Sequence, residues 1–443
     1  MMGKTKEKNI GNSAIYDVST LGTAKTLILG LQHTFAMFGA TVLVPILTGL
    51  DVSTTLLMAG LGTLLFHFLT KGKVPAFLGS SFAFLGGFAA VAPMMDGKAN
   101  LEMLPYACGG VFMAGLVYVA MSGLIKLFGV KKIMRFFPPV VTGPIIISIG
   151  LILAPTAISN CTTNWPLALV ALALIIICNI WGKGMVKIVP ILIGVVGSYI
   201  VALMMGEVDF APIQNAAWFG VALHSSAFAK FSVSACITIM PIALATMMEH
   251  IGDIAAISAT TEQNFLEDPG LHRTILGDGL ATSLAGFFGG PANTTYGENT
   301  GVLALTKVYD PKVMRIAAVF AIFLSFFPKF GAAIQTIPPA VIGGVSFVLY
   351  GMISAIGVRN VVENQVDFTE SRNLIIAAVI LVSALGFNSV GGITIAFTEA
   401  IQINLSGLAI AAIVGIVLNA VLPGNTYEFG KDLKGETSVS FKV

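Results

Sequence analysis

Charged residues are scarce in this chain of 443 residues: Asp, Glu, Lys and Arg make up 10% of it, against about 25% in a typical soluble domain. Hydrophobic residues make up 56%. The net charge of +2 is too small to indicate a nucleic-acid partner. The four cysteines stand apart, without the CxxC spacing of a zinc site, and they indicate no disulfide framework. The composition excludes an ordinary soluble protein and predicts one that resides in a lipid bilayer.

Motifs of ATP-driven pumps and of membrane hydrolases are also missing. No Walker A, HExxH, GxSxG or GxGxxG pattern stands in a fitting context. The chain is therefore not expected to be an enzyme, and we expect no nucleotide, metal or other cofactor.

Long apolar runs fill most of the sequence, each about 17–25 residues long and able to span a bilayer as a helix. They are continuous, as in residues 167–180, and lack the alternation of barrel strands. The predicted fold class is an all-α polytopic membrane protein. We expect fourteen transmembrane segments, at residues 25–49, 53–70, 75–93, 104–128, 138–154, 166–181, 186–205, 231–258, 272–289, 291–306, 312–333, 337–357, 373–388 and 405–423. Residues 389–404 are too polar to span and are expected at the interface as an amphipathic piece.

The distribution of positive charge tests this count. Of the 24 Lys and Arg residues, all but Lys98, Lys230 and Lys329 fall on one side when the spans are threaded alternately. Cytoplasmic loops carry the excess of basic residues, and a miscounted span would invert every later loop. We therefore expect a multi-pass membrane protein with both termini in the cytoplasm.

Three pairs of segments repeat within the chain, each pair seven spans apart. They are 137–143 (FPPVVTG) with 337–343 (IPPAVIG), Gln32-His33 with Glu249-His250, and 78–84 (LGSSFAF) with 289–296 (GGPANTTY). Because seven is odd, the two halves must lie upside down relative to each other, as in many secondary transporters. The sequence predicts a first seven-span repeat over 25–205, an inverted second repeat over 231–423, and cytoplasmic tails at 1–24 and 424–443.

The third pair interrupts two spans with short polar residues. Such interruptions at matching positions of two repeats indicate a binding site near the membrane midplane. We expect two extended stretches that cross there, each followed by a half-helix that begins near Phe82 or Gly297. Their free N–H groups would face a polar ligand.

Two carboxylates lie in otherwise apolar spans. Glu249 is in span eight and Glu298 is at the first turn of the half-helix in span ten. A charge at the bilayer centre costs about 2.5–3.5 kcal/mol on insertion scales, so such residues are usually functional. Asp253 stands one helical turn after Glu249, on the same face. Two close carboxylates disfavour double ionisation, which suits a proton carrier.

The alternatives are a cytoplasm-side surface position for Asp253 and simple helix capping for Glu298. His33, in span one, either braces the site by hydrogen bonds or packs inertly, and the role of His250 is open.

Five motifs carry a resemblance to a known family. They are LQHTFAMFGATVLVP, VPAFLGSSFAF, ATMMEHIGD, DPGLHR and PANTTYGENTG, together with Thr306-Lys307. From about residue 25 to 425 the chain resembles the nucleobase–ascorbate transporter family, and within it the bacterial uracil permeases. The resemblance implies fourteen spans in two inverted sevens, with a core domain and a gate domain. It also implies that the membrane is a bacterial inner membrane.

The resemblance also implies roles for individual residues. Glu249 and Glu298 would bind the pyrimidine ring, and Phe82 and Gly297 would add backbone contacts. Tyr296 would lie next to the site. The implied function is proton-coupled import of uracil by alternating access, with uracil or a related nucleobase, protons and the lipid bilayer as partners. A homodimer remains open as the state of assembly.

One position departs from the uracil permease pattern. Asp253 stands where those proteins have a histidine tied to proton coupling, and purine carriers tend to have Asp there. Glu298 favours uracil, because purine carriers usually have Gln at its position. Asp253, Glu249 and His33 are the candidates for proton coupling. The alternatives are a carrier of xanthine, uric acid or another nucleobase, and an anion transporter of the same architecture.

Overall fold

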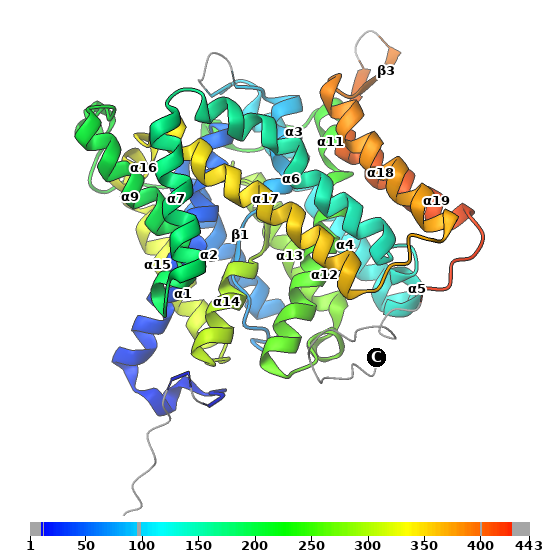
Figure 1. The fold of residues 1–443 in the computed structure, drawn as a ribbon, viewed down its shortest axis with the longest axis horizontal. Helices are drawn as coiled ribbons and strands as arrows, with labels where there is room; N and C mark the ends of the chain where they lie inside the picture. Colours follow the sequence, from blue (N-terminus) through cyan, green and yellow to red (C-terminus); the bar gives the residue numbers. More distant parts are fainter. Residues whose placement is uncertain (1–9, 12, 95–98, 399–400, 428–443) are drawn as a thin grey trace, which may run out of the picture.

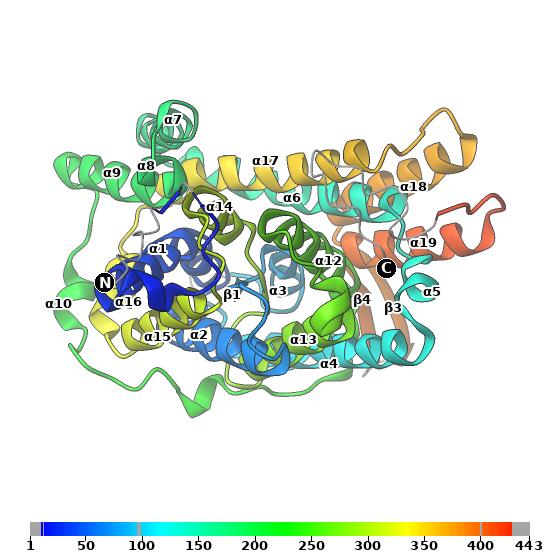
Figure 2. The same ribbon diagram turned by 90° about the horizontal axis from the view of Figure 1, so that it is seen from below.

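Helices form most of the computed structural model, which describes residues 10–11, 13–94, 99–398 and 401–427. Figures 1 and 2 show them in two packed bundles. The first bundle contains α1 (Thr23–Thr48), α2 (Val52–Leu69), α3 (Leu85–Val91), α4 (Leu104–Phe128), α11 (Val233–Ile239), α12 (Ile242–Thr261), α13 (Leu271–Phe287), α14 (Gly297–Thr306) and α15 (Lys312–Ser325). The second contains α6 (Pro139–Cys161), α7 (Trp165–Trp181), α9 (Pro190–Met205), α17 (Pro339–Glu363), α18 (Ser371–Ser389) and α19 (Gly407–Val421).

Short elements connect these helices. They are α5 (Val130–Met134), α8 (Met185–Ile188), α10 (Ala211–Asn215), α16 (Pro328–Gln335), η1 (Val18–Leu21), η2 (Phe82–Phe84), η3 (Ser225–Ala227) and η4 (Leu266–Gly270). Four strands complete the described part: β1 (Leu78–Ser80), β2 (Asn293–Thr295), β3 (Ile393–Thr398) and β4 (Ile401–Leu405).

The predicted spans coincide with helices along the chain, and α4 matches the predicted 104–128 to the residue. By length and apolar composition, seven described helical segments can cross a bilayer alone, and α15 with α16 makes an eighth if that bent pair is one span. The shorter apolar helices α7, α9 and α19, and the half-helix at 82–91, account for other predicted segments.

Two of the predicted segments have a form that the sequence did not predict. The predicted span 312–333 is not one straight helix, because α15 and α16 meet at 86° where Pro328 starts a new helix. The piece at 389–404, expected at the interface as an amphipathic segment, forms in its described part the antiparallel hairpin β3–β4, as the alternating residues of 393–398 allow. Residues 399–400, and residues 428–443 of the predicted tail, lie outside the described part of the chain.

Glycines bring the helix backbones of each bundle into contact. An added Cβ at Gly150 of α6 would lie 2.1 Å from the carbonyl oxygen of Tyr350 on α17. In the first bundle an added Cβ at Gly115 of α4 would lie 2.5 Å from the carbonyl oxygen of Gly279 on α13. Small residues at helix crossings permit this close packing in a bilayer, where apolar burial supplies little attraction between helices. Each bundle is therefore tightly packed internally.

The interrupted spans meet as predicted. β1 and β2 pair antiparallel, with Gly79 opposite Thr294, and all six strand residues are buried. Further bonds run from Ser81 N to Ala292 O (2.8 Å) and from Tyr296 N to Phe77 O (3.1 Å). Backbone N–H and C=O groups at membrane depth must find partners within the protein. Each broken span thus satisfies the other, and η2–α3 and α14 begin next to the crossing.

The repeated proline motif also has one structural role in both halves. Pro139 and Pro339 are the first residues of α6 and α17, where proline lacks only an N–H that would have no helical partner. The two helices pack against each other along their length (Figure 1).

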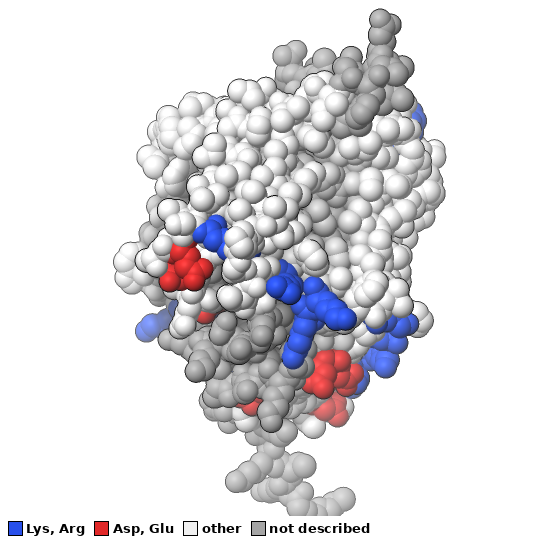
Figure 3. Space-filling view, turned by 90° about the vertical axis from the view of Figure 1, so that its right-hand side faces the viewer, with Lys and Arg blue, Asp and Glu red and all other residues white. Residues whose placement is uncertain are grey.

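The surface separates apolar from charged residues. Large apolar side chains such as Ile180, Phe323 and Val382 are exposed on the described helices, which suits contact with lipid. Figure 3 shows a broad uncharged surface, with most of the visible Lys and Arg gathered towards its lower end. In Figure 1 the first described residues of the chain, drawn in dark blue, also lie at the lower end. This agrees with the asymmetry of basic residues in the sequence.

We expect Gly79→Ala to weaken the strand crossing. An added Cβ at Gly79 would lie 2.5 Å from the ring of Tyr296, so the ring or strand must shift. Overpacking of this kind costs about 1–3 kcal/mol. The measurement is thermal unfolding of the purified protein in detergent. Gly123→Ala is the control, because nothing lies within 4 Å of a Cβ added to that helical glycine. An equal loss of stability in both variants would contradict this interpretation.

Candidate functional site

Three carboxylates from two elements meet beside the strand crossing. Glu249 and Asp253 lie on α12 and Glu298 lies in the first turn of α14. All three are half-buried, and Glu249 is within electrostatic range of Glu298. An added Cβ at Gly297 would lie 3.7 Å from Asp253 Oδ1, so Asp253 faces the start of α14. The structure therefore brings together Glu249, Asp253, Gly297 and Glu298, as the sequence predicted, and Asp253 is not a surface residue at the helix end.

Asp253 is held by a residue of the crossing strand. Thr295 Oγ1 donates a hydrogen bond to Asp253 Oδ2 at 2.9 Å. The second carboxylate oxygen remains directed to the N-terminus of α14, whose partial positive charge stabilises an anion. The two oxygens of Asp253 thus have different surroundings, one tied to β2 and the other facing the site.

Tyr296 braces the crossing instead of pointing into the site. Its hydroxyl donates to Ser80 O at 3.0 Å and lies 3.2 Å from the donating Thr41 Oγ1. The ring covers Gly79 of β1. Tyr296 therefore lies next to the site, as expected, and ties both interrupted spans to α1.

His33 has a comparable bracing position. It is fully buried, and Asn299 Nδ2 lies 3.1 Å from both the His33 ring Nδ1 and the His33 carbonyl oxygen. Asn299 is the neighbour of Glu298 in the sequence. His33 thus fixes α14 against α1, which agrees with the bracing alternative. Its bond partner, Asn299, is one residue from the carboxylate of Glu298.

Both half-helices begin without a side-chain cap. Ser81 precedes η2 and Tyr296 precedes α14, and neither side chain accepts a bond from the following turn. The first N–H groups of a helix have no partner within it, so they can bind a ligand carbonyl. Phe82, at the start of η2, is half-buried, and its ring meets Tyr350 of α17 edge to face at 6.1 Å. Phe82, whose backbone is predicted to contact the ligand, therefore lies at the boundary of the two bundles.

A cavity of about 440 Å³ extends from Glu298 between the two bundles. α1 and α14 line one side, and α7, α8, α9 and α17 line the other. Its polar side chains are Glu298, Asn179 and Lys187, and it continues past Gly301 to Leu305. The next residue, Thr306, accepts a backbone bond from Gly11 of the N-terminal arm. The cavity thus leads from Glu298 along α14 towards the end of the molecule where the described N-terminal arm lies (Figure 1).

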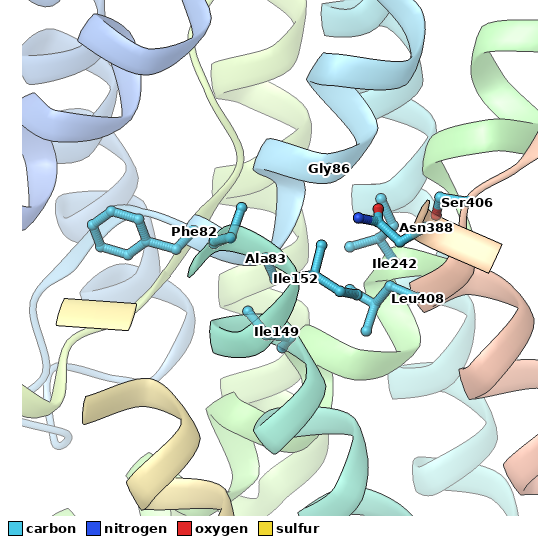
Figure 4. A pocket seen from close by; sticks show the side chains of 10 residues that line it. Phe82, Ala83, Gly86, Ile149, Ile152, Ile242, Asn388, Ser406 and Leu408 are labelled. Carbon is cyan, nitrogen blue, oxygen red and sulfur yellow. The ribbon is translucent and has the colours of Figure 1, made fainter. Parts of the chain in front are cut away.

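The opposite side of the crossing is packed shut. The pocket there holds only about 10 Å³, roughly one water molecule. In Figure 4 the ring of Phe82 points away from Asn388 and Ser406. The other lining side chains shown are mostly apolar and include Ile149, Ile152, Ile242 and Leu408. Of these two spaces, only the cavity beside Glu298 is large enough for a ligand.

Sequence reasoning missed several polar residues around the site. Asp278 on α13 is fully buried and faces His250, with His250 Nδ1 at 3.4 Å from Asp278 Oδ2. Thr295 was expected only as part of an extended stretch, and Lys187 only as a basic residue at the start of the span 186–205. An ionisable residue within a span is itself a signal of function, so Asp278 was detectable from the sequence. Its partner was not, because no local pattern links α12 to α13.

The arrangement suits a small, uncharged, hydrogen-bonding ring. Carboxylates accept ring N–H groups, the uncapped helix starts donate to carbonyls, and apolar residues of α1 and α17 lie alongside. Among the described residues, no three His, Cys, Asp or Glu side chains are arranged so that they could hold a metal ion together.

Comparison with known proteins gives the family. A family model described as the permease family matches residues 24–391. The uracil permease of Bacillus caldolyticus is 43% identical over 423 residues, covering 93% of this chain and 94% of that protein. A probable uracil permease of Pasteurella multocida is 43% identical over 409 residues, covering 90% and 94%.

Among solved structures, the transmembrane domain of a cyanobacterium bicarbonate transporter, BicA, has a TM-score of 0.62 at 18% identity. It covers 85% of this chain and 98% of that chain, and the likeness concerns the fold alone. Together with the matches in sequence, it agrees with the expected fold class, a mostly helical multi-pass membrane protein. The chain belongs to the permease family of nucleobase–ascorbate transporters.

Proposed function

We propose that this protein is a uracil transporter of a bacterial inner membrane and that it works as a proton symporter by alternating access. The observation that carries the proposal is the meeting of Glu249 and Glu298 beside the uncapped start of α14, at the closed end of a 440 Å³ cavity. Similarity to uracil permeases over nearly the whole chain supports the choice of cargo.

Uracil fits the chemistry of this site. The ring has two N–H donors and two carbonyl acceptors. Ionised Glu249 and Glu298 accept from N–H groups, while the backbone N–H groups at the starts of η2 and α14 answer the carbonyls. A buried polar group without a partner costs about 1–3 kcal/mol, so a base with a different donor pattern is disfavoured.

The proton is assigned to the α12 carboxylates, with Asp253 as its main carrier. Asp253 faces the site through Oδ1 and lies one turn from Glu249 on the same helix face. Because close carboxylates repel each other when both are ionised, Glu249 and Asp253 readily hold one proton between them. The two carboxylates then titrate as a unit. Protonation from the outside would favour the loaded state, and loss of the proton inside would favour release.

The membrane arrangement proposed here is fourteen spans in two inverted repeats of seven, over 25–205 and 231–423. The pairing of β1 with β2 and the shared role of Pro139 and Pro339 support it. The first bundle is the core domain that carries the site, and the second is the gate domain. The cavity beside Lys187 then opens to the cytoplasm.

Two alternatives make different demands on the site. A carrier of xanthine, uric acid or another nucleobase would share the fold, and Asp253 is compatible with it. An anion transporter is favoured by the fold of BicA, but the carboxylates of Glu249, Asp253 and Glu298 would repel an anion at the same place. Competition of unlabelled bases against radiolabelled uracil separates these alternatives from the proposal.

Glu298→Gln should weaken uracil binding roughly ten- to hundredfold. The change replaces a charged acceptor with an amide that also donates, and a hydrogen bond to a charged group contributes about 1.5–3 kcal/mol. Binding of radiolabelled uracil to the purified variant measures the effect. Glu102→Gln, the same substitution at an exposed position, is the control. Unchanged affinity in Glu298→Gln would remove Glu298 from the list of ligands.

Asp253→Asn should keep uracil binding and exchange but abolish accumulation driven by a pH gradient. The amide imitates a carboxyl that cannot release its proton. Proteoliposomes allow binding, exchange of internal for external uracil, and gradient-driven uptake to be compared in one preparation. If the variant still concentrates uracil with an unaltered dependence on pH, the coupling proton is held elsewhere, with Glu249 and His33 the next candidates.

Labelling of single cysteines tests the orientation. A cysteine at Glu207, beyond the end of α9, should react with an impermeant thiol reagent added to sealed cells. A cysteine at Lys131 on α5 should react only after the cells are opened, because α5 carries basic residues that the proposed topology places in the cytoplasm. The unsubstituted chain gives the background from its own cysteines. Labelling at position 131 in sealed cells would reverse the proposed topology.

A further inference from the structure

A buried pair of ionisable residues lies behind the site and has no role in the function proposed above. His250 of α12 and Asp278 of α13 are both 0% exposed, and His250 Nδ1 lies 3.4 Å from Asp278 Oδ2. The ring also meets Phe66 of α2 edge to face, at 6.1 Å between ring centroids. An isolated carboxylate in such surroundings is costly, so the pair needs a shared proton to exist there.

The pair is connected to Asp253 through one hydroxyl. Thr295 Oγ1 lies 3.4 Å from His250 Nδ1 and donates to Asp253 Oδ2 at 2.9 Å. Since the hydroxyl proton is used towards Asp253, the lone pairs of Oγ1 are the atoms that face the ring. A proton on Nδ1 is then donated to Thr295 Oγ1, and the carboxylate of Asp278 lies 3.4 Å from the same nitrogen, where its charge stabilises that proton. This fixes the direction in which Thr295 donates.

Other titratable groups face this cluster from the neighbouring elements. Glu249 and Asp253 of α12 are within electrostatic range of Asp278, and Glu298 of α14 is within range of Asp253. Tyr118 of α4 donates to Thr246 and is also within range of Asp278. His67 of α2 is buried, but its Nε2 is engaged with Ala76 O at 2.9 Å. Among these described groups, His250 is the base that contacts Thr295.

We propose that His250 and Asp278 are a positioning pair that holds the Thr295 hydroxyl towards Asp253 and so sets the pH at which Asp253 takes up its proton. The inference rests on the proposed role of Asp253 in coupling. The proton adds to Oδ1, which faces Gly297, while Oδ2 keeps its bond from Thr295. No hydrogen bond that links His250, Thr295 and Asp253 has to break, so uptake and release of the proton involve only Asp253 Oδ1.

The sign of the effect follows from the direction of the Thr295 bond. A donor to an ionised carboxylate stabilises the charged form, so its loss makes the carboxylate bind a proton at higher pH. Thr295→Val removes the donor and keeps the shape of the side chain. Thr295→Ser keeps the donor. The midpoint of pH-dependent uracil uptake should rise by about one pH unit in Thr295→Val and stay in place in Thr295→Ser.

The buried pair is tested by the double variant His250→Phe/Asp278→Asn in the full-length protein, reconstituted in proteoliposomes. The double change leaves no unpaired buried carboxylate and preserves the net charge of an ion pair. It should raise the midpoint in the same direction as Thr295→Val, and it should add nothing when combined with Thr295→Val, because the pair acts through that hydroxyl. The single variant His250→Asn keeps an N–H donor at the place of Nδ1. Its midpoint should therefore equal that of the unsubstituted protein. His67→Phe is the matched control at the other buried histidine of this region and should leave the midpoint unchanged.

The outcomes separate this inference from the proposed function. If Asp253→Asn leaves the pH profile of uptake intact, the proton is held elsewhere and both proposals fall. If Asp253→Asn flattens the profile and Thr295→Val shifts it, but the double variant lowers only the amount of transport without moving the midpoint, His250 and Asp278 are merely structural and the inference is overturned. Additive shifts in the combined variant would also overturn it, because they indicate action through space and not through Thr295.

Discussion

The rest of the structure depends on the backbone pairing of two short strands that lie buried among the helices. An interrupted span exposes N–H and C=O groups that lipid cannot satisfy. β1 and β2 satisfy each other, and the residues around them make this possible: Gly79 admits the ring of Tyr296, whose hydroxyl then bonds to Ser80. Once the strands are paired, the starts of η2 and α14 are fixed beside them with uncapped N–H groups. The binding site is thus a consequence of how the broken spans are repaired.

The crossing also explains how three carboxylates can share one place. Glu298 and Asp253 both lie near the start of α14, where the helix dipole offsets negative charge. Thr295, from β2, ties Asp253 to the crossing, and Asn299 ties α14 to His33 of α1. Charge is therefore tolerated at the midplane only where irregular backbone and polar side chains surround it. The same polar groups that permit the charge also hold it in position for a ligand.

Much of this was accessible from the sequence, and the reason differs from element to element. Apolar length predicted α4 to the residue, and the matched interruptions at 78–84 and 289–296 predicted both the crossing and the half-helix that begins at Gly297. The bend before Pro328 and the hairpin at 393–405 were missed, because an average over an apolar window conceals a local break and a two-residue alternation. The contact of His250 with Asp278 was beyond reach, since helical periodicity gives the face of a residue but not the helix that it meets.

The distribution of close contacts determines which parts can move. Within each bundle, glycines bring backbones together, as at Gly115 with Gly279 and at Gly150 with Tyr350, so sliding inside a bundle would create clashes at once. Between the bundles lies the 440 Å³ cavity on one side of Glu298 and a packed apolar layer around Ile149 and Leu408 on the other. In the proposed alternating-access cycle, a change of access would therefore need the first bundle to shift as a body against the second, opening the apolar layer and closing the cavity. Because the carboxylates and both helix starts belong to the first bundle, the proposed site would keep its geometry during that movement.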